Sequence, residues 1–271
     1  MNRYRVKPDK PVNLHDHDAL DTGEYKDKEA VAERTEQLRQ KLDALQERLY
    51  AEGSRAVLVV LQGIDSAGKD GTIRHVMSGV NPQGCTVTSF KAPTPLESAH
   101  DFLWRIHVAC PPHGYIGIFN RSHYEDVLIT RVHALITDKE AKHRLHQIRD
   151  FEKMLSHNGT RILKFFLHIS EDEQKKRLLQ RVDNEAKRWK FSPQDLKERE
   201  YWKAYQEAFE EALSATSTEE APWFIVPANH KWYRNLVVAD CLTKALEDMD
   251  PHPPKVEGID WKQIRREMSE S

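Results

Sequence analysis

The sequence feature that most constrains the fold is AVLVVLQ, residues 56–62, which is followed at once by a glycine-rich turn. Its apolar and β-branched residues occupy consecutive positions instead of alternating with polar ones. This pattern is typical of a strand that is buried on both faces, and such strands belong to parallel sheets. The run therefore predicts a strand inside a parallel sheet.

Four further stretches have strand character, and helical patterns lie between them. The other expected strands are CTVTSF (85–90), YIGIFN (115–120), RILKFFLHIS (161–170) and WFIVPA (223–228). The expected helices are 29–50, 70–79, 96–108, 138–157, 171–183, 194–213 and 231–247. Strands that alternate with helices predict a layered α/β fold, here with a central, mostly parallel five-stranded sheet and helices on both faces.

We expect three regions along the chain. Residues 1–28 are polar and form an N-terminal arm, which packs either on the body of the chain or on a neighbouring subunit. Residues 29–250 form one domain, with a lid at about 175–205. Residues 251–271 are rich in proline and then in charge, and form a peripheral C-terminal tail.

The first expected helix carries an apolar stripe of Leu38, Leu42, Leu45 and Leu49 at 4-3-4 spacing, and Gly53 ends it. A stripe of this kind usually faces the core of its own domain, and we expect that here. The alternative is a contact between subunits.

Composition excludes several classes of protein. The formal net charge is -2, so nothing global marks a nucleic-acid binder, and any basic site must be local. The cysteines are isolated and lack CxxC spacing, which indicates reduced thiols instead of a disulfide frame or a zinc site. No apolar run reaches the roughly 18 residues of a membrane helix, and the N-terminus lacks the apolar stretch of a signal peptide. We expect a cytoplasmic protein without nucleic-acid or membrane partners.

The turn after the first strand, GIDSAGK, matches the GxxxxGK pattern of phosphate-binding loops. In such loops the backbone N–H groups converge on phosphate oxygens, the next helix adds its positive end, and the lysine reaches the transferring phosphate. The match ends after Lys69, where Asp70 replaces serine or threonine and is expected to act as an acid at the helix N-terminus. The alternative for the whole loop is a glycine turn capped by Asp70. The candidate phosphate-binding residues are Gly63, Ala67, Gly68, Lys69, Asp70, Gly71 and Thr72.

Asp65 lies inside this anion-binding loop. A carboxylate there is repelled by phosphate unless a cation lies between them, and magnesium binds carboxylates and phosphate oxygens together. We therefore expect Asp65 to hold a metal ion in place of the missing hydroxyl. The alternative is a carboxylate held by the amides of the turn.

A second polar cluster, IFNRSHYEDV, follows the end of the third expected strand. Ligands of open α/β sheets bind beyond the carboxyl ends of the strands, so this cluster should lie near the phosphate loop. One of its carboxylates would complete the metal site begun by Asp65, and Arg121 would clamp a phosphate. The alternative is that its acids only complement a helix dipole. The candidates are Asn120, Arg121, Glu125 and Asp126.

Residues 175–203 are rich in lysine and arginine, interrupted by Trp189 and Phe191. Such a run is usually a solvated helical face. In a phosphotransferase it can also form a lid, which excludes water and brings cations to the developing charge. The candidate lid cations are Arg177, Arg181, Lys187 and Arg188, and Arg131 is a lesser candidate for binding a polyanion.

In combination these motifs resemble those of the family-2 polyphosphate kinases. The motifs are GIDSAGKDG, NRSHYEDV, ILKFFLHISEDEQKKRL, KRWKF and APWFIVPANHKWYRN, with LYAEG and DGTIRHVMSGVNPQG beside them, and they run from about residue 30 to 248. The resemblance implies a P-loop-kinase-like three-layer sandwich with a helical lid. It implies phosphoryl transfer between inorganic polyphosphate and nucleotides with Mg²⁺, for which Mn²⁺ is an alternative, and a homodimer or homotetramer.

One departure from the family pattern is informative. Many members carry Asp-Arg-Ser-Trp-Tyr-Asn where this chain has Asn120-Arg-Ser-His-Tyr-Glu125-Asp126. This version resembles the subfamily that acts on both AMP and ADP. The second metal carboxylate of the family falls on Asp126, which we favour over Glu125.

We therefore expect a reversible reaction in which polyphosphate and AMP or ADP give a shorter polyphosphate and ADP or ATP, with guanine nucleotides as further candidate substrates. The expected catalytic residues are Asp65, Lys69, Arg121 and Asp126, of which Asp65 and Asp126 bind metal. The alternatives are an ATP-dependent P-loop kinase for nucleotides or small molecules, and a regulatory protein that binds nucleotide or polyphosphate without chemistry. The sequence leaves the preference between AMP and ADP open.

Overall fold

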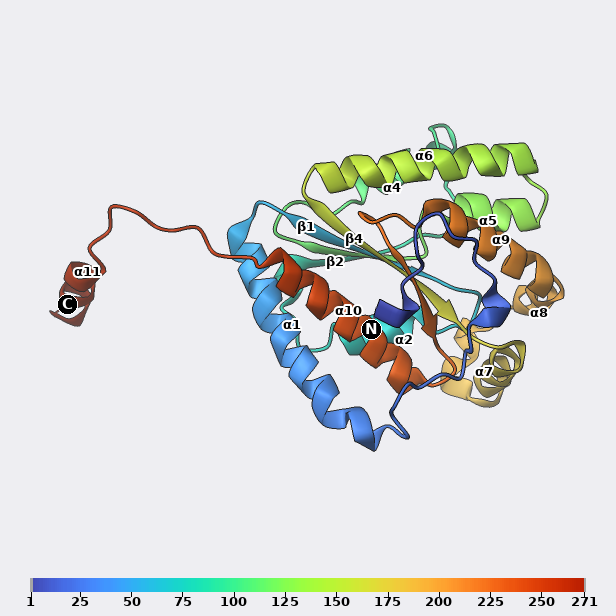
Figure 1. Cartoon of the computed structure of the whole chain (residues 1–271), viewed down its shortest axis with the longest axis horizontal. Helices are drawn as coiled ribbons and strands as arrows, with labels where there is room; N and C mark the ends of the chain where they lie inside the picture. Colours follow the sequence, from blue (N-terminus) through green and yellow to red (C-terminus); the bar gives the residue numbers. More distant parts are fainter. Residues whose placement is uncertain (1, 271) are drawn as a thin grey trace.

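In residues 2–270, which the computed structural model describes, five strands form one parallel sheet in the order β2-β3-β1-β4-β5 (Figure 1). The strands are β1 (Ala56–Gln62), β2 (Cys85–Ser89), β3 (Ile116–Asn120), β4 (Thr160–His168) and β5 (Trp223–Pro227). The central strand β1 is buried at every position, as its continuous apolar run predicts. The expectation of a mostly parallel five-stranded sheet is confirmed.

Helices cover both faces of the sheet and make a three-layer sandwich (Figure 1). One layer holds α1 (Ala32–Glu52), α2 (Lys69–Val76) and α10 (Lys231–Met249). The other holds α4 (Trp104–Val108), α5 (Glu125–Val132), α6 (Asp138–His157) and α9 (Trp202–Thr216). The remaining helices are α3 (Pro95–Ser98), α7 (Glu171–Asp183), α8 (Pro193–Glu200) and α11 (Trp261–Glu270), and the 3₁₀ turns are η1 (Asn2–Tyr4), η2 (Leu14–Asp16), η3 (Glu29–Val31), η4 (Pro82–Gly84) and η5 (Glu185–Lys190). No helix within residues 2–270 is both long and apolar enough to cross a lipid bilayer.

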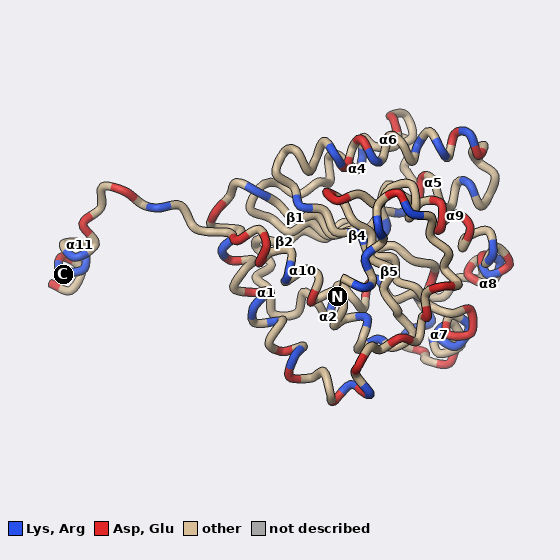
Figure 2. Tube along the Cα trace, in the orientation of Figure 1, with Lys and Arg blue, Asp and Glu red and all other residues tan. Residues whose placement is uncertain are grey.

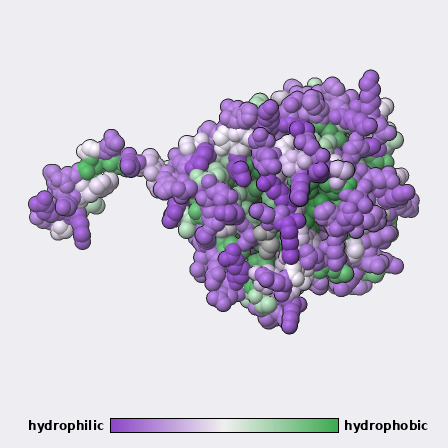
Figure 3. Space-filling model, in the orientation of Figure 1, coloured by the Kyte–Doolittle hydropathy of each residue, from purple (hydrophilic) through white to green (hydrophobic). Residues whose placement is uncertain are grey.

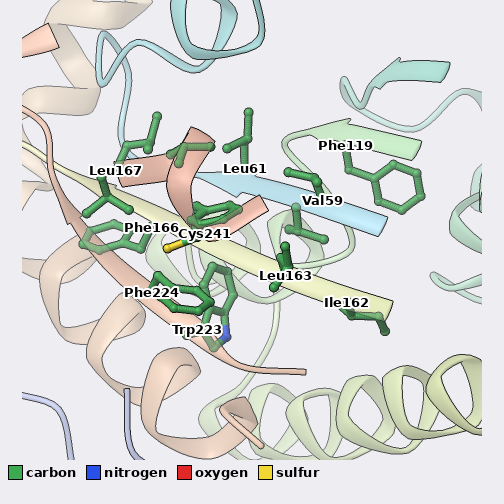
Figure 4. Close-up of a cluster of buried hydrophobic side chains, with 14 of the residues drawn as sticks. Val59, Leu61, Phe119, Ile162, Leu163, Phe166, Leu167, Trp223, Phe224 and Cys241 are labelled. Carbon is green, nitrogen blue, oxygen red and sulfur yellow. The ribbon is translucent and has the colours of Figure 1, made fainter. Parts of the chain in front are cut away.

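The core lies between the sheet and its two helical layers. Figure 4 shows part of it, with Val59 of β1, Leu163 and Phe166 of β4, Trp223 of β5 and Cys241 of α10. The leucine stripe of α1 is buried in this core, and α1 packs along α10. The stripe therefore faces the chain's own core, as predicted, and the C-cap Gly53 ends α1 in the left-handed conformation.

Two long helices expected from the sequence are each divided in two. Residues 96–108 form α3 and α4, because the Asp101 side chain accepts a hydrogen bond from Leu103 N (3.0 Å) and makes a turn between them. Residues 194–213 form α8 and α9, and Tyr201 leaves the helical conformation at the junction. Helix α5 has no counterpart among the expected helices.

The N-terminal arm packs on the body of its own chain. Val6 N donates to Trp223 O of β5 (2.8 Å), and the hydroxyls of Tyr4 and Tyr233 lie 2.8 Å apart. Leu14 N donates to Glu210 of α9 (2.7 Å). Of the two places that the sequence left open, the structure shows the first, since residues of both helical layers hold this arm.

Candidate functional site

A cavity of about 720 Å³ lies at the C-terminal ends of the strands. Segments at or after the ends of all five strands contribute to its wall, including residues of α7 and η5. The lining residues are Asp65, Ser66, Gly68, Lys69, Asp70, Gly71, His75, Ser89, Phe90, Lys91, Asn120, Arg121, Arg177, Gln180, Arg181, Lys187, Trp189, Lys190, Asp195, Lys231 and Arg234. This is the edge of a parallel sheet at which ligands bind in open α/β folds.

Positive charge dominates the cavity wall. Its nine lysine and arginine side chains face only three carboxylates, although the whole chain is slightly acidic. Figure 2 shows charged residues of both signs spread over the rest of the fold, so the excess is local. A cleft lined mainly by cations concentrates an anionic ligand. The structure therefore contains the local basic site that the composition required.

The phosphate-type loop joins β1 to α2 with a strained backbone. Ser66 and Gly68 have φ of 69° and 104°, and a Cβ on Gly68 would lie 2.0 Å from Arg234 Nη1, so only glycine fits there. Lys69 Nζ turns back and donates to Gly63 O (2.5 Å) and Ile64 O (3.4 Å). Burial lowers the pKa of Lys69, and Arg121 lowers it further. The ammonium group of Lys69 therefore lies against the backbone carbonyls of its own loop.

Other loop residues shape the loop or connect it to its neighbours. Ala67 is fully buried, and Thr72 Oγ1 donates to Gly68 O (3.1 Å), so neither lines the cavity. Asp70 accepts from Asn120 Nδ2 (2.9 Å) and from Lys190 Nζ (3.0 Å). Although burial raises the pKa of Asp70, these hydrogen bonds lower it overall. Asp70 therefore connects the loop, the end of β3 and η5.

Asp65 and Arg121 form an ion pair across the site. Arg121 Nη2 donates to Asp65 Oδ1 (2.8 Å), from a backbone with φ of 63°. Both residues also line a second cavity of about 190 Å³, together with Gly63 and Glu125. Burial raises the pKa of Glu125, and repulsion from Asp65 acts in the same direction, while Arg121 and Lys69 oppose them. Two carboxylates from different strand ends thus face one small space.

Asp126 does not share this space, and the prediction that it lies with Asp65 is wrong. Its carboxylate accepts from Arg105 Nη2 (3.1 Å), and both side chains lie mostly buried beside a separate cavity of about 570 Å³. Successive residues of a helix point about 100° apart, so Glu125 faces Asp65 where Asp126 cannot. Which carboxylate binds metal stays a prediction, but the geometry favours Glu125.

Two of the predicted lid cations line the cavity, Arg181 and Lys187. Arg177 also reaches it, but its guanidinium donates to Ser66 O (3.0 Å) and Ala67 O (2.8 Å) of the loop and to Ala228 O (2.5 Å) after β5. Arg177 therefore braces backbone carbonyls, which is a positioning role.

The two remaining basic candidates lie outside the cavity. Arg188 donates to Val182 O of α7 (2.8 Å) and to Glu185 of η5 (3.1 Å). Arg131 pairs with Asp138 (2.9 Å) and with Glu211 of α9. In the structure these guanidinium groups pair with neighbouring carbonyls and carboxylates, so a role for them in binding a polyanion stays a prediction.

The model of the family described as polyphosphate kinase 2 matches residues 25–254. The chain belongs to the polyphosphate kinase 2 family.

Relatives in this family resemble the chain over most of its length. A protein of Meiothermus ruber named AMP/ADP-polyphosphate phosphotransferase is 51% identical over 95% of this chain and 97% of its own. An ADP-polyphosphate phosphotransferase of Rhodopseudomonas palustris is 47% identical over 85% of this chain and 84% of its own. The crystal structure of polyphosphate kinase 2 from Arthrobacter aurescens TC1 superposes with a TM-score of 0.95 and 43% identity, covering 99% of this chain and 96% of that one.

In this member of the polyphosphate kinase 2 family, sequence reasoning missed two cations of α10. Lys231 and Arg234 follow the end of β5 and line the cavity. Arg234 is buried, which lowers its pKa to about 9, and Nη1 donates to Ala67 O (3.3 Å). The sequence did contain a signal for these two residues, because NHKWYRN directly follows the strand WFIVPA. It therefore lies at the edge of the sheet where ligands bind.

Residues 189–195 also bring side chains to the cavity that the sequence did not single out as ligand contacts. Trp189 lines the cavity and is 78% exposed, with Lys190 Nζ 5.0 Å from its ring centroid. Asp195 lies 3.7 Å from Arg181 and lines both cavities near Asp65. An exposed aromatic ring among cations offers a flat apolar surface in an otherwise charged site.

The donor set fits a magnesium ion that shares its ligands with a substrate. Asp65 and Glu125 supply carboxylate oxygens from two strand ends into one small cavity. Within residues 2–270 no three histidine, cysteine, aspartate or glutamate side chains form a metal-binding group. Magnesium commonly binds one or two carboxylates and completes its shell with substrate phosphates and water. The site suits that arrangement better than a closed protein cage.

Proposed function

We propose that this chain transfers phosphoryl groups from inorganic polyphosphate to AMP or ADP, giving ADP or ATP. One observation carries the proposal: in a polyphosphate kinase 2 fold, cations from all parts of the strand-end edge line one cavity around a phosphate-type loop. The relatives named as AMP/ADP-polyphosphate and ADP-polyphosphate phosphotransferases support it. Polyphosphate and nucleotides are both anions that such a cavity would collect.

The chemistry needs charge neutralisation more than a base. A phosphate group has a second pKa of about 6, so the attacking phosphate oxygen of the nucleotide is already charged at neutral pH. The remaining barrier comes from repulsion between two polyanions and from their alignment. Lys69 and Arg121 would neutralise charge at the loop, and Arg181 and Lys187 would do so from the lid.

Other residues would hold the machinery in shape. Arg177 and Arg234 both donate to the carbonyl of Ala67, which would hold the backbone of the loop in one conformation for binding phosphate. Asp65 and Glu125 would hold Mg²⁺, or Mn²⁺ in its place, and the ion when bound would neutralise phosphate charge and orient the reacting groups. Closure of η5 over the cavity would exclude water from the transferring group.

Trp189 would provide a stacking surface for the nucleobase. Every base has a π face, and stacking on an aromatic side chain tolerates changes of base. Polyphosphate has no such face, so this contact would serve only the nucleotide.

A donor comparison tests the proposal. Purified protein is incubated with AMP, ADP or GDP and Mg²⁺, with either polyphosphate or ATP as donor, and the products are separated by chromatography. Steady formation of ADP from AMP, and of ATP from ADP, with polyphosphate supports the proposal. Transfer from ATP alone would replace it with an ATP-dependent kinase, and binding without turnover would replace it with a regulatory role.

A further inference from the structure

The first half of α7 buries polar side chains against the phosphate-type loop. Hydrophilic side chains cover most of the face of the molecule that Figure 3 shows, whereas Gln174 and Arg177 of α7 are only 4% and 6% exposed. They occupy positions i and i+3, so they lie on the same face of the helix. Buried polar groups need hydrogen-bond partners, and both side chains have theirs in the loop.

Gln174 and Arg177 hold the two peptide groups that flank Ser66. Gln174 Nε2 donates to Asp65 O (3.1 Å), and Arg177 Nη1 donates to Ser66 O (3.0 Å). Ser66 has a φ of 69°, a conformation that is strained for a residue other than glycine. Such a conformation persists where the surrounding structure fixes it. Helix α7 therefore supplies hydrogen bonds that hold the strained backbone directly after Asp65.

The start of α7 is attached to the segment that follows β5. Ser170 N donates to Asn229 Oδ1 (3.0 Å), and Asn229 Nδ2 donates to Ser170 Oγ (3.0 Å). Ser170 is also the N-cap of α7, where its hydroxyl accepts from Glu173 N (3.3 Å). These contacts fix where α7 begins, and with it the positions from which Gln174 and Arg177 reach the loop.

The other end of the Gln174 amide contacts α8. Arg199 Nη1 donates to Gln174 Oε1 (2.7 Å) and to Glu171 O (3.3 Å). A carbonyl oxygen can only accept and a guanidinium can only donate, so Asp65 and Arg199 select the same orientation of the amide. Helix α8 matters for the site, because its Asp195 lines both cavities. One side chain of α7 thus links α8 to the phosphate-type loop.

We propose that Gln174 is a positioning residue that couples the docking of α8 to the conformation of the phosphate-type loop. While Arg199 contacts α7, it fixes the Gln174 amide, which in turn holds the carbonyl of Asp65. When α8 moves away, the amide loses this restraint, and the strained backbone at Ser66 is held less firmly. Docking of α8 therefore prepares the loop for the reaction. As a control of that reaction, the coupling rests on the proposed phosphoryl transfer.

A double-mutant cycle in kcat tests the coupling. Gln174→Met keeps the length of the side chain and removes both hydrogen bonds, and Arg199→Met removes the contacts of Arg199 with α7. We expect kcat to fall about 10-fold or more for Gln174→Met and about 3- to 5-fold for Arg199→Met. KM for ADP and for polyphosphate should change less than about threefold, because the variants alter how the loop is held and not which groups meet the substrates.

The double variant carries the decision. Because Arg199 acts through Gln174, the double variant should match Gln174→Met within about twofold in kcat. Lys197→Met removes one positive charge from the exposed surface of the same helix, and as the matched control it should keep wild-type kcat. If Gln174→Met does not fold, Gln174→Glu takes its place, since an ionised carboxylate still accepts from Arg199 but cannot donate to Asp65 O.

Hydrogen exchange of the protein without substrate measures the loop directly. Amides of residues 63–69 should exchange faster in Gln174→Met and in Arg199→Met than in the wild-type chain or in Lys197→Met. The amide of Ala67, which donates to Ile64 O (3.1 Å), should show the change most clearly. Amides of β1 should keep their wild-type protection in all four proteins.

Three results would each overturn the coupling: wild-type kcat in the Gln174 variant, losses of kcat that multiply in the double variant, or exchange of residues 63–69 that no variant changes. A wild-type chain that forms no ATP from ADP and polyphosphate would instead refute the proposed function. In that case the exchange experiment alone would still decide whether α8 and the loop are coupled through Gln174.

Discussion

Glu125 and Asp126 are adjacent carboxylates on α5 with different surroundings. Glu125 faces Asp65 and Arg121, whereas Asp126 pairs with Arg105 on the far side of the helix. A metal ion bound by Asp65 and Glu125 would not contact the ion pair of Asp126 and Arg105. The two residues therefore allow a comparison in which position, helix and chemistry are nearly matched.

Glu125→Gln should raise the Mg²⁺ concentration that gives half-maximal activity by at least 10-fold, because one metal oxygen ligand is lost. Asp126→Asn should change that concentration less than about threefold, but lower the free energy of unfolding by about 1–3 kcal/mol, because the buried Arg105 then keeps only the more distant carboxylate of Glu97 (3.9 Å). Magnesium titrations of activity and urea unfolding measure both. The reverse pattern would restore Asp126 as the metal ligand.

Asp65→Asn tests the loop acid. We expect kcat to fall about 100-fold or more, since the substitution removes charge at the point where phosphate charge develops. The unfolding transition should hardly move, because the ion pair with Arg121 is partly exposed and contributes little to stability. Wild-type turnover by this variant with Mg²⁺ would remove the proposed metal role of Asp65.

Trp189→Leu should raise KM for ADP about 10-fold, as expected for the loss of one stacked base. KM for polyphosphate should stay the same, because polyphosphate offers no ring to stack. Trp189→Phe keeps an aromatic face and should restore most of the affinity for ADP. Equal losses for both substrates, or no rescue by phenylalanine, would assign Trp189 to the closure of the lid instead.

At the scale of elements, a buried polar network holds α5 in place. Lys164 of β4 pairs with Glu152 of α6 and donates to Tyr124 OH (3.0 Å) and Thr216 O (2.7 Å). His123 Nε2 lies 3.1 Å from Glu152 Oε1. Tyr124 and His123 directly precede α5, so this network sets the start of the helix that presents Glu125.

Lys164→Met should lower the free energy of unfolding by about 3–5 kcal/mol, because it removes the ammonium partner of the buried Glu152. Adding Glu152→Leu should recover part of this loss, since the pair is then replaced by two apolar side chains. Chemical unfolding of the single and double variants provides the test. If the double variant lost more free energy of unfolding than the two single variants lose together, the network would act through contacts other than this pair.

The sequence predicted elements well where their pattern is long and periodic. Helices α6 and α7 lie at the expected residues, and β1 does too. Helix α5 was not expected, and without its phase the directions of Glu125 and Asp126 could not be told apart. The role of Arg177 could not be predicted for a similar reason. An arginine in this segment can bind phosphate or, as here, donate hydrogen bonds to the carbonyls of Ala67 and Ala228.

At the scale of the whole molecule, stability should depend on pH through His168, which ends β4 under the N-terminal arm. Burial lowers the pKa of His168 to about 4. Below its ordinary pKa of about 6.5, the unfolded chain gains a proton that the folded chain does not, so stability falls as the pH falls from about 6.5 to 4. This residue alone should cost about 2 kcal/mol between pH 7.5 and 5.

His168→Phe should remove that part of the acid sensitivity, because the ring no longer titrates. Guanidinium unfolding of the wild-type and variant chains at pH 7.5 and 5 gives the comparison. The difference between the two pH values should be smaller in the variant by about 2 kcal/mol. An equal pH dependence in both chains would show that His168 titrates normally in the folded state.

The pairing of Arg121 with Asp65 ties two events together. While the ion pair is formed, each side chain partly neutralises the charge of the other. The site therefore attracts free ions less strongly. Any cation that captures the carboxylate also sets the guanidinium free, at the moment when an anion arriving with that cation needs a clamp. One exchange of partners would then prepare the site to bind both a cation and an anion. Neither Asp65 nor Arg121 would be left without an oppositely charged partner.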